Sequence, residues 1–195
     1  IITARLFEKA GADAIAASAY APPYKVTCPT ASHIAYVPNT IVPYAAAIKQ
    51  AVSIPVTAVG NISIEDGNRF IAEGKFDYLQ IARKLLADPE LPNKVKKNRM
   101  DEARLCLNCY VCVSQMYVGK TVKCAINPEC CHETEVSITP AKAKKRVLVI
   151  GGGPAGMETA RVAAMRGHDV TIVDKGDKLG GTLFFASVCT PTNYR

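Results

Sequence analysis

The sequence predicts an α/β fold with parallel strands, and three observations lead to this expectation. The chain has 195 residues, of which 49% are hydrophobic, so it can bury a core and is not a disordered polypeptide. Short apolar strands alternate with amphipathic helices over residues 1–100. Further along, a glycine-rich turn stands between another apolar strand and a helix. We therefore expect helices packed on parallel sheets.

The elements of residues 1–100 follow one another as helix and strand. An apolar stripe over residues 3–10 predicts a helix that ends at Gly11, and a short apolar strand follows it. The expected order is strand 13–18, a proline-rich loop, helix 40–51, strand 54–59, helix 64–73 and strand 76–81. Because helices alternate with strands, the strands should be parallel and their connections right-handed.

A cluster of cysteines lies in residues 101–140, which have no sustained helical or strand period. The chain has eight cysteines, and Cys106, Cys109, Cys112 and Cys124 are separated by two, two and eleven residues. Three closely spaced thiolates and a distant fourth suit a 4Fe-4S cluster, whereas structural zinc usually takes two separated pairs. The alternatives are a zinc site and free or disulfide-bonded cysteines, and Cys130 or Cys131 could compete for the fourth position.

A glycine-rich motif follows predicted strand 146–150 and opens predicted helix 154–167. Its residues are Gly151-Gly152-Gly153-Pro154-Ala155-Gly156, a G-x-G-x-x-G pattern. Gly151 permits a tight turn, Gly153 lets a pyrophosphate approach the backbone, and Gly156 allows close packing of the helix on the sheet. The sequence therefore predicts a dinucleotide site.

Asp174 stands at the end of the next predicted strand, residues 169–173. A carboxylate there can accept a hydrogen bond from a ribose hydroxyl, which disfavours a 2′-phosphate and hence NADP at this site. FAD and NAD both fit. A second glycine motif, Leu179-Gly180-Gly181, resembles one found in FAD-binding disulfide-reductase-like domains and favours FAD.

Composition excludes several other classes of protein. The net charge of +7 is not concentrated: the densest basic runs, residues 94–99 and 142–146, are interpreted as a helix end and a linker. Aromatic residues make up 7% and tryptophan is absent, so we expect no nucleic-acid partner. No membrane-length apolar stretch or signal peptide is evident, which predicts a cytoplasmic location. The chain lacks an initiator methionine and is expected to be a piece of a longer protein.

Several motifs occur together in an order that resembles a known family. They are residues 54–62, residues 81–92, the cysteine run, Asn127-Pro128 with Cys131-His132-Glu133, and residues 149–156. Together they resemble the NADH:flavin oxidoreductase / 2,4-dienoyl-CoA reductase family, the iron-sulfur branch of the old yellow enzymes. Trimethylamine dehydrogenase, enoate reductases and bile-acid ene-reductases belong to this branch. The two residues between Cys109 and Cys112 resemble the amine-dehydrogenase-like members, whereas the dienoyl-CoA reductases have three.

The resemblance implies a three-part organisation. Residues 1–100 would be the C-terminal part of an FMN-binding TIM (β/α)8 barrel, residues 101–140 an iron-sulfur segment, and residues 141–195 the start of a Rossmann-like FAD/NAD(P)-binding domain. The FMN phosphate would be held where two strands end, by Gly60, Asn61, Ala82 and Arg83. The cluster would be held by Cys106, Cys109, Cys112 and Cys124. FAD would be held by Gly151, Gly153, Pro154, Ala155, Gly156, Asp174, Lys175 and Gly181.

The function that the resemblance implies is reduction of activated carbon-carbon double bonds, of the enoate or enoyl-CoA type. Electrons would come from NAD(P)H through FAD, the 4Fe-4S cluster and FMN, and the substrate would be a small unsaturated carbonyl compound or thioester. No proton donor is assigned, although Tyr20, Tyr24, His33 and Tyr36 lie in a loop that could approach the flavin. The alternatives are a trimethylamine-dehydrogenase-like amine oxidoreductase and an inactive truncated or zinc-stapled binding module. The oligomeric state and the choice between NADH and NADPH are left open.

Overall fold

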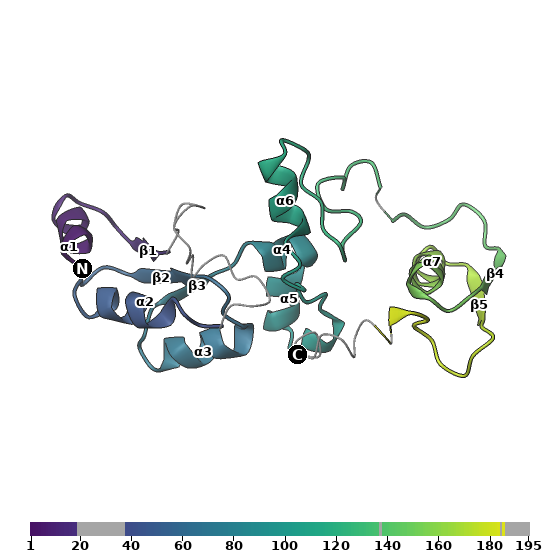
Figure 1. The fold of residues 1–195 in the computed structure, drawn as a ribbon, viewed down its shortest axis with the longest axis horizontal. Helices are drawn as coiled ribbons and strands as arrows, with labels where there is room; N and C mark the ends of the chain where they lie inside the picture. Colours follow the sequence, from purple (N-terminus) through teal and green to yellow (C-terminus); the bar gives the residue numbers. More distant parts are fainter. Residues whose placement is uncertain (19–37, 137, 184, 186–195) are drawn as a thin grey trace. The chain divides into compact units, whose positions relative to one another are not determined.

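The computed structural model describes residues 1–18, 38–136, 138–183 and 185 (Figure 1). It divides into two compact units, Ile1–Cys130 and Cys131–Arg195. Each unit has its own sheet of parallel strands, so the predicted α/β class is confirmed. The tyrosines and His33 of the proline-rich loop, together with Cys28 and Cys189, lie outside the described residues.

The sheet of the first unit has the order β1-β2-β3, with all pairs parallel. Its strands and the helices around them are α1 (Ile2–Lys9), β1 (Ile15–Ala17), α2 (Val42–Lys49), β2 (Val56–Val59), α3 (Ile64–Ala72) and β3 (Tyr78–Gln80). Figure 1 shows α2 and α3 on the same side of this sheet. Because the strands are parallel, their carboxyl ends meet at one edge, where Gly60 and Ile81 follow β2 and β3.

The core of this unit lies between the sheet and its helices. In β2 the side chains of Val56 and Ala58 are fully buried while their neighbours are partly exposed, as expected for alternating faces of a strand. Phe76 is 1% exposed, and its ring meets that of Phe70 edge-to-face with centroids 6.4 Å apart. This core fixes the strands whose ends form the site described below.

Four short helices follow β3. They are α4 (Arg83–Ala87), α5 (Leu91–Lys96), the 3₁₀ helix η1 (Met100–Glu102) and α6 (Val111–Tyr117). The sequence predicts no periodic element in residues 101–140, and α6 shows that this expectation is wrong at that point. A helix of seven residues is too short to display a helical period in the sequence.

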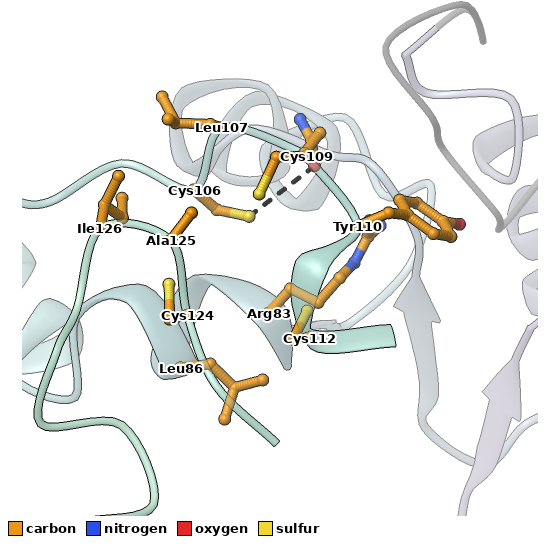
Figure 2. A pocket seen from close by; sticks show the side chains of 11 residues that line it. Arg83, Leu86, Cys106, Leu107, Cys109, Tyr110, Cys112, Cys124, Ala125 and Ile126 are labelled. Carbon is orange, nitrogen blue, oxygen red and sulfur yellow. Dashed lines mark hydrogen bonds between the residues drawn. The ribbon is translucent and has the colours of Figure 1, made fainter. Parts of the chain in front are cut away.

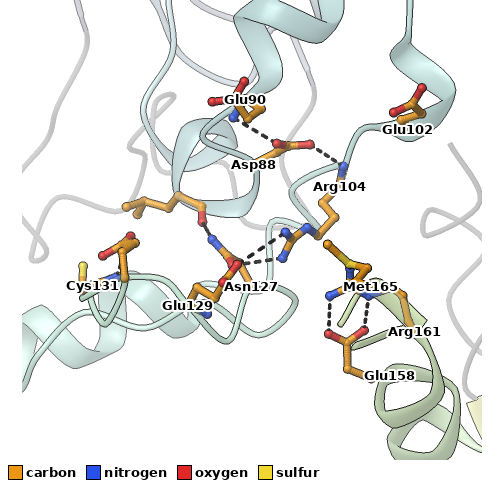
Figure 3. A network of polar contacts seen from close by, with 12 residues as sticks. Asp88, Glu90, Glu102, Arg104, Asn127, Glu129, Cys131, Glu158, Arg161 and Met165 are labelled. Carbon is orange, nitrogen blue, oxygen red and sulfur yellow. Dashed lines mark hydrogen bonds and ion pairs between the residues drawn. The ribbon is translucent and has the colours of Figure 1, made fainter. Parts of the chain in front are cut away.

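Two buried polar side chains form hydrogen bonds that hold residues 104–127, called here the cysteine segment, to these helices (Figure 3). Asp88 is 2% exposed; its Oδ2 accepts from Lys94 Nζ at 2.6 Å and from the Arg104 amide at 2.9 Å. Asn127, also 2% exposed, donates to the Leu86 carbonyl at 2.8 Å and accepts from Arg104 Nη1 at 3.0 Å. The segment between residues 104 and 127 is thereby held at both ends.

The ionisation of Asp88 follows from these contacts. Burial by itself raises the pKa of this carboxyl, but the hydrogen bonds from Lys94 and from the Arg104 amide outweigh it and hold the pKa below its ordinary value. Asp88 is therefore an anion at neutral pH, paired with the ammonium of Lys94, which is 15% exposed.

The second unit contains one strand-helix-strand motif. Strands β4 (Arg146–Ile150) and β5 (Asp169–Val173) pair in parallel, and α7 (Pro154–Met165) connects them. Both strands have the predicted bounds. The sequence predicts a buried strand at 146–150, yet Leu148 and Ile150 are 61% and 82% exposed, because the described part of this sheet has two strands and a single helix to cover it. Among the described residues, no helix combines the length and apolar character needed to span a membrane.

The Asp88 contacts generate a stability prediction. Asp88→Asn should lower the free energy of unfolding of the first unit by about 3 kcal/mol at pH 7, because it leaves the Lys94 ammonium without its carboxylate. Since the folded pKa of Asp88 is depressed, its stabilisation is present above the unfolded pKa and is lost as the pH falls through the folded pKa. The difference between variant and parent should therefore shrink in acid.

Denaturant unfolding at several pH values checks this prediction, with Asp101→Asn as the control because Asp101 is exposed. Equal stability of the Asp88→Asn variant and the parent at pH 7 would contradict the role assigned to Asp88.

Candidate cofactor sites

A hollow lies at the carboxyl ends of β2 and β3. It is lined by Val59, Gly60, Gln80, Ile81, Ala82, Arg83, Lys84, Cys106 and Asn108, and is called here the strand-end hollow. Three of the residues expected to cradle the FMN phosphate are therefore brought together. The fourth, Asn61, is not part of the lining, but its Oδ1 accepts from Asn108 Nδ2 at 3.5 Å.

Two consecutive cations face this hollow. The Arg83 guanidinium lies over the ring of Tyr110, 5.0 Å from the ring centroid. Burial lowers the pKa of the neighbouring Lys84, and an ionised Cys106 would raise it. A guanidinium and an ammonium at the ends of parallel strands suit an anionic group such as a phosphate. The sequence motifs indicate Arg83 at this site but give no sign of Lys84 or Asn108, whose positions depend on the tertiary fold.

A second hollow is lined by the four cysteines of the predicted cluster, and Figure 2 shows their sulfur atoms around one space. Its other lining residues are Arg83, Leu86, Leu107, Asn108, Tyr110, Ala125 and Ile126, and it is called here the cysteine hollow. Cys124 supplies the fourth sulfur in this arrangement. Cys130, which is 2% exposed, and Cys131 are not part of the lining.

Four cysteine thiols at one hollow suit two kinds of metal centre, a 4Fe-4S cluster and a single zinc ion. Within the described ranges, no three Cys, His, Asp or Glu side chains are grouped so that they could hold a metal ion. A tetrahedral zinc site needs its sulfurs about 2.3 Å from one atom, whereas a 4Fe-4S cluster binds each thiolate at a different iron. The preference for a cluster rests on the order of the ligands in the sequence, three closely spaced cysteines and a distant fourth, all of which line this hollow.

The backbone of the cysteine segment turns sharply between the ligand candidates. Asn108 and Tyr110 have φ of 52° and 64°, and Tyr110 precedes the first residue of α6. Asparagine tolerates this left-handed conformation, but for a tyrosine it costs about 1–2 kcal/mol.

Burial raises the pKa of the Cys112 thiol in this segment, so a bound cation would be needed to hold it as a thiolate.

The strand-end hollow and the cysteine hollow adjoin each other. Arg83, Cys106 and Asn108 line both. The Cys106 thiol donates to Asn108 Oδ1 at 3.9 Å, and Asn108 in turn contacts Asn61 after β2. The cysteine segment therefore lies directly against the strand ends of the sheet.

In the second unit, the glycine turn has the geometry that its pattern predicts. Gly151 has φ of +101°, and a Cβ on Gly156 would lie 1.9 Å from the Gly151 carbonyl oxygen, so α7 packs against the turn too closely for any side chain. A Cβ on Gly153 would meet nothing within 4 Å, which leaves the backbone open to a ligand. Pro154 and Ala155 begin α7 directly after it.

Asp174 and the second glycine motif complete this site. The Asp174 carboxylate accepts from the Gly152 amide at 2.6 Å and from the Gly176 amide at 2.8 Å, and these bonds lower the pKa of Asp174. The Gly180 amide donates to the Gly152 carbonyl at 2.8 Å. Gly181, whose φ is +52°, lies against Gly153: a Cβ there would be 3.4 Å from the Gly153 Cα. Lys175, beside Asp174, is exposed.

Comparisons with known proteins give the class of this chain. Residues 19–102 match the model of the NADH:flavin oxidoreductase / NADH oxidase family, and residues 146–189 match an FAD binding domain. Both matched models are of flavin proteins. The resemblance that the motifs indicate is therefore confirmed over residues 19–102, which match the model of the NADH:flavin oxidoreductase / NADH oxidase family.

Two curated relatives are reductases. A metal reductase from Desulforamulus reducens is 46% identical over 142 residues, which are 72% of this chain and 21% of the relative. A cinnamate reductase from Clostridium sporogenes is 41% identical over 143 residues, which are 72% of this chain and 22% of the relative. The chain thus spans about a fifth of the length of these relatives.

Solved structures confirm the fold. A 2-naphthoyl-CoA reductase in complex with 2-naphthoyl-CoA matches with a TM-score of 0.85 and 29% identity over 98% of this chain and 30% of that one. A 6-hydroxypseudooxynicotine amine oxidase from Pseudomonas geniculata matches with a TM-score of 0.74 and 32% identity over 81% of this chain and 25% of that one. The sheet of the first unit is accordingly the C-terminal part of a TIM barrel, and the second unit begins a Rossmann-like domain.

The close approach at Gly156 generates a prediction. Gly156→Ala should destabilise the second unit by about 1–3 kcal/mol, because the added methyl group overlaps the Gly151 carbonyl oxygen. Within a helix, replacing glycine by alanine usually increases stability, so the loss of stability expected here is the opposite of the usual effect. Hydrogen exchange of α7 and β4 measures the effect. Gly153→Ala is the control, since its methyl group enters open space; equal protection in the two variants would refute the packing assigned to Gly156.

Proposed function

We propose that this chain is part of a flavin- and iron-sulfur-dependent oxidoreductase that reduces activated carbon-carbon double bonds with electrons from NAD(P)H. The observation that carries the proposal is the contact between the strand-end hollow and the cysteine hollow, which share Arg83, Cys106 and Asn108. A flavin site and a cluster site that adjoin each other are what electron transfer between the two groups requires.

The residues of the first unit would divide the binding of the two groups between them. Cys106, Cys109, Cys112 and Cys124 would hold a 4Fe-4S cluster, and their spread around one hollow fits this ligand set. Arg83 would neutralise the FMN phosphate, with the backbone at Gly60 and Ala82 close beside it and Asn61 orienting Asn108. When bound, the flavins would supply hydride transfer and the cluster would supply transfer of single electrons.

The residues of the second unit would bind FAD at the glycine turn. The open backbone at Gly153, at the amino end of α7, would face the pyrophosphate. Ala155 would offer the first N–H of that helix beside it, because Pro154 has none. Asp174 keeps lone pairs beyond those that bond Gly152 and Gly176, so it could still accept from a ribose hydroxyl. Gly181 would close the site opposite Gly153, and Lys175 would lie at its rim.

The proposed substrate is a small unsaturated carbonyl compound or thioester. Similarity to a cinnamate reductase and to a 2-naphthoyl-CoA reductase supports this class. The proposal includes a cytoplasmic location and no nucleic-acid partner.

An amine oxidoreductase is the second candidate, because the chain also resembles an amine oxidase and has two residues between Cys109 and Cys112. Anaerobic assays of the full-length protein with NADH and cinnamate, and separately with dimethylamine and an artificial acceptor, decide between them. Turnover of the amine alone would overturn the ene-reductase proposal.

The cluster assignment predicts the metal content of the full-length protein. Anaerobically prepared protein should hold about four iron and four sulfide per chain. Cys109→Ala should lose most of both, because Cys109 lines the cysteine hollow, whereas Cys131→Ala should keep them, because Cys131 does not. Iron, zinc and sulfide analysis gives the answer. Stoichiometric zinc without sulfide would support a zinc-stapled module instead.

A further inference from the structure

Lys84 occupies a position between the two proposed cofactor sites. It is the second residue of α4, which begins where the chain leaves β3, and it lines the strand-end hollow together with Arg83 and Cys106. Its side chain is only partly exposed. Cys106 in turn lines both hollows, so Lys84 lies beside the one cysteine that the described linings share.

The charge of Lys84 has no close counterpart in the part of the chain that the structure describes. No carboxylate there lies within 4.0 Å of its ammonium. Glu65 and, once ionised, Cys106 favour its charged form, whereas Arg83 opposes it. A largely buried ammonium without an ion pair costs free energy. We therefore expect an anionic group beside Lys84 when the protein carries its cofactors.

We propose that Lys84 raises the reduction potential of the iron-sulfur cluster assigned to Cys106, Cys109, Cys112 and Cys124. This inference rests on the proposed function. The redox step is the transfer of one electron to the oxidised cluster from the reduced flavin that the proposed function supplies; the flavin is oxidised by one electron, and no bond of the cluster is formed or broken. The added electron makes an anionic centre more negative, and a cation in partly dehydrated surroundings stabilises that reduced state more than the oxidised one.

Arg83 would act in the same direction, because it lines both hollows, whereas Lys84 lines the strand-end hollow. The Arg83 guanidinium lies over the Tyr110 ring, and it is the cation that the phosphate of a flavin would engage. Lys84 adds a second positive charge to the lining of the strand-end hollow, which also contains Cys106. The charge of Lys84 would stabilise the reduced form of the cluster and so favour transfer of single electrons to it from the neighbouring flavin site.

An anaerobic redox titration of the cofactor-loaded full-length protein, followed by electron paramagnetic resonance, tests this inference. Lys84→Gln should shift the one-electron equilibrium of the cluster about tenfold towards the oxidised form, which corresponds to a potential lower by about 59 mV. Lys84→Arg should keep the parent potential. Lys123→Gln is the matched control: Lys123 stands next to Cys124 in the sequence but is exposed, so water screens its charge and the potential should change little.

The outcomes separate this inference from the proposal on which it rests. A Lys84→Gln variant with full iron and sulfide and an unchanged potential overturns the role of Lys84 and leaves the cluster assignment intact. Loss of FMN at an unchanged potential also overturns it, because Lys84 would then serve the flavin phosphate alone. A parent protein without iron and sulfide overturns the cluster assignment itself. Removal of a largely buried, unpaired charge should not prevent folding.

Discussion

The hydrogen bonds of Asp88 and Asn127 are the constraint on which the candidate site depends. The cysteine segment buries little apolar surface: the side chains of Leu105 and Leu107 are 47% and 44% exposed. What holds it against the barrel portion is polar, namely the Arg104 amide on Asp88 and the Arg104 guanidinium on Asn127. Both anchors are buried, where a hydrogen bond to a charged group contributes about 1.5–3 kcal/mol. They bring Cys106 and Cys124, near the two ends of the segment, to the same hollow.

The parallel sheet of the first unit then determines what the cysteines meet. Because β2 and β3 run in the same direction, the residues after both strands lie at one edge, and Cys106 and Asn108 join them there. Arg83 and Lys84 bring positive charge to this edge, and the cysteines, once ionised by a metal centre, bring negative charge. Because water has limited access to this edge, these positive and negative charges interact strongly there. Such interactions influence how readily neighbouring groups gain or lose an electron.

The sequence predicted most completely those elements whose signals are local. Strand 146–150 and the glycine turn after it are recognisable because an apolar run, a tight turn and a helix start follow one another within a few residues. Helix α6 was missed because it has seven residues and begins at a strained Tyr110, which no local pattern indicates. The spacing of the cysteines predicted which thiols gather, but not that they gather beside the strand ends. That arrangement depends on Asp88 and Asn127, whose hydrogen-bond partners are distant in the sequence. The contacts of Asn108 and the surroundings of Lys84 likewise involve residues that are distant in the sequence.

The central claim is that the four cysteines lining one hollow hold an iron-sulfur cluster against a flavin site. X-ray absorption spectroscopy at the iron edge of anaerobically prepared full-length protein tests it most directly, because it reports the atoms around the metal. We expect iron surrounded by sulfur together with scattering from neighbouring iron atoms, as a 4Fe-4S cluster requires. A single metal ion with four sulfur ligands and no neighbouring metal would rule out a cluster at these cysteines.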